Sequence, residues 1–175
     1  LGIRRRLFPL MENNRTAVEL LHSMLFTLPG SPILYYGDEI GMGDNIYLGD
    51  RNGCRTPMQW TEDRNAGFSK TNPSRLYSPV IQDPVYSYEA VNVENALQNE
   101  YSFLRWLRRL IKVREQHLAF SRGTVQFLES KNRKTLAYIC KHRDDVALVV
   151  NNLSKNAQFV QLELQEFNGY VPVDL

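Results

Sequence analysis

The fold is decided by residues 16–37, which read TAVELLHSMLFTLPGSPILYYG. Apolar side chains recur there at helical spacing as far as position 28, so the spacing predicts a helix over residues 16–28 that ends at Pro29 and Gly30. The unbroken apolar run from Pro32 to Tyr36 predicts a strand buried on both faces, as in a parallel sheet. A helix, a short turn and a buried strand together indicate an α/β fold.

The chain that follows divides into three patterns. Residues 37–100 lack periodicity and are rich in Gly, Pro, Asn, Asp and Tyr, which predicts a long loop of the kind that is usually functional. A second amphipathic helix is predicted over residues 102–116. Beyond Gly123 the period changes to two, which predicts an antiparallel meander in a β-sandwich, with strands at residues 125–127, 136–140, 146–150 and 160–164.

Composition excludes several classes of protein. The 175 residues carry 21 Lys+Arg and 19 Asp+Glu, a formal net charge of +2, so no strong field points to nucleic acid or to an acidic membrane surface. No apolar run approaches membrane-spanning length. The two cysteines lie far apart, which argues against a zinc site or a disulfide framework and favours a reducing, cytoplasmic compartment.

Two neighbouring carboxylates follow the predicted strand, at the position where α/β barrels place their sites. Asp38 and Glu39 could be taken for the paired carboxylates of a glycoside-cleaving enzyme. Neighbouring residues that leave a strand point in opposite directions, whereas a retaining pair must face each other across the sugar. We therefore expect these two carboxylates to hold loops by hydrogen bonds and not to form a catalytic pair.

Two motifs in this part of the chain are specific. Residues 30–41 read GSPILYYGDEIG and resemble the last barrel strand of the α-amylase family, and residues 55–60 read RTPMQW and resemble the signature of its α-glucosidase and glucosyltransferase branch. The short join DNIYLGDR at 44–51, with DPVY at 83–86 and VNVE at 91–94, resembles the trehalose synthase group of that family. Within this resemblance Cys54 stands where a small aliphatic residue is expected, and a buried thiol is nearly equivalent.

The resemblance implies a fold and a division into domains. Residues 1–118 are expected to be the C-terminal part of a catalytic (β/α)8 TIM barrel with a long rim loop, and residues 119–175 a C-terminal antiparallel β-sandwich domain that is truncated. Because the chain starts at Leu1 and not at Met, we expect a C-terminal fragment whose main partner is the missing N-terminal part of the barrel.

The resemblance also implies an activity, the interconversion of maltose and trehalose by intramolecular glucosyl transfer with retention. Its nucleophile, acid/base and third carboxylate are expected upstream of Leu1, so this chain has no catalytic residue and is expected to be inactive alone. Among the residues present, Arg55 is the expected sugar contact, because the matching family arginine pairs with an upstream Asp and helps to bind the non-reducing glucose. The alternative for Arg55 is a salt bridge that braces the loop.

Roles are also predicted for two charged residues, a tryptophan and the histidines. Asp50 and Arg51 are candidate substrate-binding residues at the pocket entrance, although a local ion pair explains them almost as well. Trp60 is expected to be buried support beside Arg55. The three histidines, His22, His117 and His142, are expected to be structural.

The sequence predicts no metal site and no cofactor in this chain. Calcium in the full-length enzyme stays open, and so does a homo-oligomer. The expected small-molecule partners are maltose, trehalose and glucose, with no nucleic acid and no membrane.

Two alternatives to this function are retained. The full protein could be an α-glucosidase or a sucrose-isomerase-like enzyme of the same branch. The chain could instead be a non-catalytic carbohydrate-binding or interaction module, which predicts sugar binding by the isolated chain. If the activity is instead the interconversion of maltose and trehalose, residues 43–53 are expected to be a lid that excludes water from the pocket, since water would complete hydrolysis.

Overall fold

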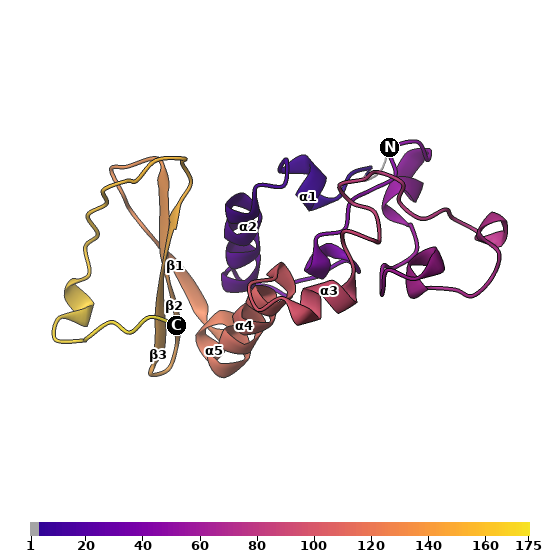
Figure 1. Ribbon diagram of the computed structural model, residues 1–175. Coiled ribbons are helices and arrows are strands. Elements are labelled where there is room, and N and C mark those ends of the chain that lie inside the picture. The colour runs from indigo at the N-terminus through magenta and orange to yellow at the C-terminus, as the bar shows by residue number, and fades with distance from the viewer. Residues whose placement is uncertain (1–3) are drawn as a thin grey trace. The chain divides into compact units, whose positions relative to one another are not determined.

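The computed structural model describes residues 4–175 (Figure 1). Its helices and strands are α1 Leu7–Leu10, α2 Arg15–Thr27, α3 Val93–Gln98, α4 Phe103–Gln116, α5 Leu118–Arg122, β1 Thr124–Leu128, β2 Thr135–His142 and β3 Asp145–Asn152. Single 3-10 turns lie at η1 Asp38–Ile40, η2 Asp50–Cys54, η3 Arg64–Gly67, η4 Pro73–Arg75 and η5 Gln165–Phe167.

Helices α2 and α4 confirm the two helices predicted from periodicity. The side-chain oxygen of Asn14 accepts a hydrogen bond of 3.1 Å from the backbone N–H of Ala17 and so caps the start of α2. Residues 37–100 are largely irregular, as predicted, but the sequence pattern missed the short helix α3, which is capped in the same way by Asn92.

The predicted buried strand at Pro32 to Tyr36 is wrong. The segment forms no strand, and Ile33 and Tyr35 are 85% and 43% exposed. A strand of a parallel sheet is buried only when neighbouring strands carry its backbone hydrogen bonds and helices cover both faces. Within residues 4–175 no strand runs beside this segment, because the sheet contains only β1, β2 and β3.

The described residues form two compact units. The first combines residues 4–21 with 33–109, and the second combines residues 22–32 with 110–175. A core cluster in the first unit gathers side chains from the long irregular stretch: Ile40, Met42, Met58 and Ile81 are buried together, with Tyr86, Val91, Val93, Ala96 and Leu104 packed against them. Residues 37–100 are therefore a packed loop with its own hydrophobic core.

The second unit contains the predicted meander, in the order β1-β2-β3 with both pairs antiparallel (Figure 1). One face of β2 packs on α5: Tyr138, Cys140, Ala147, Ala119 and Phe120 are buried in one cluster. The Tyr138 hydroxyl lies 2.5 Å from the Thr27 hydroxyl, so this fully buried phenol is satisfied.

The predicted fourth strand, at residues 160–164, is wrong. The segment keeps alternate exposure, with Val160 and Leu162 less exposed than Gln161 and Glu163, but it pairs with no strand of the described chain. The side-chain amide of Asn132 holds the preceding residues through the Phe159 carbonyl at 2.9 Å and the Gln158 side chain at 3.1 Å. Period-two patterning specifies which side chains face inward, whereas a strand also needs a free edge beside it.

One carboxylate ties the hairpin to the helix before it. Asp145 starts β3. Its side chain accepts a hydrogen bond of 2.9 Å from the N–H of Ala119, in the first turn of α5, and lies 3.0 Å from Nδ1 of His117. Desolvation works to raise the pKa of Asp145, but the hydrogen bonds from Ala119 and His117 outweigh it and leave the pKa below its ordinary value. The predicted structural role of His117 is confirmed by this contact.

We predict that Asp145→Asn in the full-length protein weakens the acid sensitivity of folding. Because the folded pKa is lowered, the carboxylate stabilises the fold above its ordinary pKa of about 3.9, and this contribution is lost as the pH falls through the lowered value. Urea unfolding at pH 6 should show a loss of about 1 kcal/mol for the variant, as for a lost helix cap. The difference from wild type should shrink as the pH falls below 4. The control is Asp144→Asn, an exposed neighbour; equal pH dependence in wild type and Asp145→Asn would contradict the assignment.

Candidate functional site

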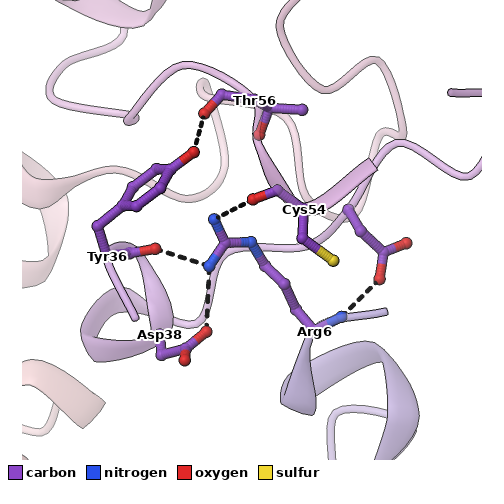
Figure 2. A network of polar contacts seen from close by, with 6 residues as sticks. Arg6, Tyr36, Asp38, Cys54 and Thr56 are labelled. Atoms are coloured by element: carbon purple, nitrogen blue, oxygen red, sulfur yellow. Dashed lines mark hydrogen bonds and ion pairs between the residues drawn. The ribbon is translucent and has the colours of Figure 1, made fainter. Parts of the chain in front are cut away.

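A buried arginine organises the first unit (Figure 2). The Arg6 side chain is 1% exposed. Its Nη1 donates to the backbone oxygen of Tyr36 at 2.7 Å and to the carboxylate of Asp38 at 3.1 Å, and its Nη2 donates to the backbone oxygen of Cys54 at 2.9 Å. The planar guanidinium meets acceptors from two loop segments through two nitrogens held in a fixed fork, whereas an ammonium group donates from a single nitrogen.

Aromatic rings complete the surroundings of Arg6. Its guanidinium carbon lies 5.1 Å from the ring centroid of Tyr35 and 5.0 Å from that of Tyr36, within cation–π range. Burial, followed by the charge of the neighbouring Tyr35, raises the pKa of Tyr36 to about 12. The Tyr36 phenol therefore stays protonated and donates 2.7 Å to the backbone oxygen of Thr56.

A second carboxylate anchors the start of the chain to the next loop. Asp44 is buried, and its carboxylate accepts two hydrogen bonds of 2.9 Å, one from the backbone N–H of Arg6 and one from Nε of Arg5. The predicted role of carboxylates in holding these loops is confirmed for Asp38, which pairs with Arg6. Asp38 and Glu39 share the single turn η1, and only Glu39 reaches the neighbouring cavity.

The cavity beside this network has a volume of about 510 Å³. Four aromatic residues contribute to its wall, namely Tyr36, Trp60, Phe68 and Tyr77, and the charged residues Glu39 and Arg55 also line it. An apolar, aromatic wall with a few polar groups is typical of a small-molecule site, and flat rings suit the apolar faces of sugars.

The structure separates the three predicted substrate-binding residues. Arg55 lines the cavity, and within residues 4–175 its side chain forms no ion pair. Asp50 and Arg51 lie in the preceding turn η2 and do not line this cavity. They contact each other at 3.4 Å, both about half exposed. The alternative role of Arg55, a salt bridge that braces the loop, therefore has no partner among residues 4–175.

Trp60 is not buried support. Its side chain is 48% exposed and lines the cavity. The sequence motif places Trp60 directly after Gln59, and it is Gln59 that is fully buried, with its amide donating to the backbone oxygens of Tyr86 and Val91. Gln59 supplies the interior support because its amide donates to two loop carbonyls, whereas an indole has a single N–H.

Sequence reasoning missed Arg6, the central residue of the site. It appears as the last member of a basic run with Arg4 and Arg5, and such a run is usually a solvated face. The available signal was its position directly before the apolar residues of α1. That signal does not reveal the partners, because two of them are backbone carbonyls.

Some kinds of site are absent from the described part of the chain. Between residues 4 and 175 there is no group of three or more His, Cys, Asp or Glu side chains that could hold a metal ion. In the same residues no helix combines the length and apolar character needed to cross a membrane. Within residues 4–175 no disulfide forms, and burial raises the pKa of Cys54 and of Cys140.

Comparison with family models assigns both parts of the chain. The model described as alpha amylase, catalytic domain, matches residues 4–123, and the model described as maltogenic amylase, C-terminal domain, matches residues 125–175. The chain belongs to the α-amylase family. The predicted fold class, the last elements of a (β/α)8 barrel followed by an antiparallel β domain, is confirmed by this match.

Similar proteins narrow the resemblance within the α-amylase family. The chain is 54% identical to a trehalose synthase of Pimelobacter sp. over 179 residues, which cover 100% of this chain and 31% of that protein. It is also 54% identical to a trehalose synthase/amylase of Mycobacterium tuberculosis over 177 residues, 99% of this chain and 30% of that protein. The predicted resemblance to trehalose synthases is confirmed, and the chain spans about a third of the length of these curated relatives.

A solved structure supports the fold. The isomaltulose synthase from Klebsiella sp. LX3 superposes with a TM-score of 0.68 at 23% identity, covering 86% of this chain and 33% of that one. At that identity the likeness shows the fold alone.

The loop that this α-amylase family chain carries before Arg55 has a fixed base and an exposed tip. The backbone N–H of Asn45 donates 2.9 Å to the backbone oxygen of Gly53 and closes the base. At the tip, Ile46 and Tyr47 are 56% and 89% exposed. A Cβ on Gly43 would lie 2.2 Å from the Tyr86 ring, so that ring packs directly on the loop base.

We predict that Gly43→Ala destabilises the full-length protein by about 1–3 kcal/mol, because the Tyr86 ring must move to admit the methyl group. Gly49→Ala is the matched control in the same loop: a Cβ there meets nothing within 4 Å, so its effect should stay within about 0.5 kcal/mol. Urea unfolding measures both. Equal stability of the two variants would show that Tyr86 does not pack against Gly43.

Proposed function

We propose that the full-length protein interconverts maltose and trehalose by intramolecular glucosyl transfer with retention. The observation that carries this proposal is the 54% identity to a trehalose synthase, in an alignment that covers the whole chain and so includes the segment that lines the cavity. The aromatic wall and Arg55 supply the chemistry that an uncharged sugar requires, stacking surfaces and a fixed hydrogen-bond donor.

The reaction needs groups that this chain does not bring together. Retention requires two carboxylates about 5–5.5 Å apart on either side of the glycosidic bond. Among the described residues, Glu39 is the one acidic residue in the cavity wall. We propose that the reacting carboxylates lie in other parts of the whole protein, and that this chain alone is inactive.

The proposed steps conserve the glucosyl unit. A carboxylate nucleophile breaks the glycosidic bond of maltose and holds one glucosyl unit, while the acid protonates the departing oxygen of the second glucose. That glucose turns within the closed site, and its anomeric hydroxyl displaces the nucleophile to give trehalose. If water attacks instead, two glucose molecules result, so the site must exclude water.

Further properties of the whole protein follow as proposals. Cys54 and Cys140, two buried cysteines that are not joined in a disulfide, support a cytoplasmic location, where cysteines stay reduced. Asp50 and Arg51 are proposed to flank the pocket entrance, because their exposed side chains lie in the turn that leads into Arg55. A calcium ion would be held by other parts of the protein, since no suitable cluster lies within residues 4–175.

We predict that Arg55→Ala in the full-length protein raises KM for maltose about 10- to 100-fold, the loss expected for a hydrogen bond to a charged group of about 1.5–3 kcal/mol. The measurement is the initial rate of trehalose formation from maltose, with trehalose and glucose quantified separately. Arg133→Ala, in an exposed turn between β1 and β2, is the control.

Four outcomes test the function itself. Trehalose formation by wild type supports the proposal. Release of glucose without trehalose would identify an α-glucosidase, and isomerisation of sucrose but not maltose would identify a sucrose isomerase. Sugar binding by the isolated chain, with no turnover by the full protein, would favour a carbohydrate-binding module.

We also propose that residues 43–53 act as the lid that keeps water from the site. The hydrogen-bonded base lets the tip move without disturbing Asp44, which Arg5 and Arg6 hold in place. Ile46 and Tyr47 offer exposed apolar area that closure would cover.

We predict that replacing residues 46–51 by a short Gly-Ser linker raises the ratio of free glucose to trehalose several-fold, because water then reaches the glucosyl intermediate. The ratio is measured from maltose with the full-length protein, and Gly49→Ala in the intact loop is the control. An unchanged ratio in a folded, active variant would reject the lid.

A further inference from the structure

We infer that Arg6 is a positioning residue that sets the orientation of Arg55 and the cavity wall, an inference that rests on the function proposed above. Arg6 does not line the cavity, so it acts through the residues that do. Its three acceptors lie in two segments. One segment contains Tyr36 and Asp38, and the other contains Cys54, the residue directly before Arg55.

The peptide group that joins Cys54 to Arg55 is held at both of its polar atoms. The carbonyl of Cys54 accepts from Nη2 of Arg6, and the N–H of Arg55, which belongs to the same peptide group, donates 2.9 Å to the backbone oxygen of Asn52. Both polar groups of one planar peptide are therefore held. The direction in which the Arg55 side chain leaves the backbone depends on that plane.

A closed ring of contacts connects Arg6, Tyr36 and the segment around Arg55. Arg6 binds the carbonyl of Tyr36, and the Tyr36 phenol donates to the carbonyl of Thr56, the residue after Arg55. The chain from Cys54 to Thr56 returns to Arg6. Arg55 is thus held from both sides by a ring of contacts that the Arg6 guanidinium closes.

Burial strengthens the contacts of Arg6. Arg6 is almost fully buried, so water competes little for its donors and its hydrogen bonds are stronger than they would be in water, although its carboxylate partner Asp38 is 24% exposed. A lysine at this position keeps the charge but has one nitrogen, which cannot serve the carbonyls of Tyr36 and Cys54 through separate atoms.

The test is a double-mutant cycle in the full-length protein, with Arg6→Lys, Arg55→Ala and the combined variant. Arg6→Lys alone should raise KM for maltose about tenfold, the loss of one to two hydrogen bonds of about 1 kcal/mol each, with a smaller change in kcat. In the Arg55→Ala background it should have little further effect on KM, because the residue it positions is gone. Arg5→Lys, at a half-exposed neighbour whose side chain binds Asp44 alone among residues 4–175, should leave KM unchanged.

Two results would overturn the inference. One is a lower Tm for Arg6→Lys with an unchanged KM, which is the behaviour of a merely structural residue. The other is additivity, in which Arg6→Lys raises KM equally with and without Arg55. If Arg6→Lys does not fold, Tyr36→Phe opens the ring at Thr56 while keeping the buried ion pair, and the same criteria apply to it.

The outcome is separable from the proposed function. If the wild-type protein does not make trehalose from maltose, the proposed function fails, and the cycle is then measured as the Kd for glucose by calorimetry. Coupling between Arg6 and Arg55 in that Kd would keep the positioning role, and additive effects on Kd would reject it.

Discussion

Burial of the Arg6 guanidinium is the constraint on which the first unit depends. Removing a guanidinium from water costs several kcal/mol, and the cost is offset only where acceptors converge with good geometry. Here they converge from residues 30, 32 and 48 positions away along the chain. Because the acceptors must all be in place together, the cation fixes the relative positions of three segments: the start of α1, the segment at Tyr36 and the turn η2 before Arg55.

This constraint explains how a long stretch with little regular secondary structure keeps a defined shape. Backbone carbonyls that have no helix or strand partner are satisfied by buried polar side chains, Arg6 on one side and Gln59 on the other. Between them, Met42, Met58 and Ile81 form the hydrophobic core. The cavity wall is therefore built on residues that are fixed twice, by apolar packing and by hydrogen bonds.

The parts of the structure that could be predicted are those whose signal is local. Helices α2 and α4 and the three strands were visible as periodic patterns, since each periodicity reports one buried face. The segment from Pro32 to Tyr36 was not, because an apolar run specifies a strand only if its neighbours are present. The RTPMQW motif located Arg55 in the site, but it could not tell whether Trp60 or Gln59 faces the interior, since that depends on which loop carbonyls need donors.

The partners of Arg6 have a consequence for how the sequence can vary. Two of its three acceptors are main-chain carbonyls, which every residue type supplies. The side chains at positions 36 and 54 can change without losing these contacts, and Cys54 in place of a small aliphatic residue is an instance. Arg6 itself has no such freedom. Homologues should therefore retain Arg6 and Asp38 together while position 54 varies, although the bond there holds Arg55.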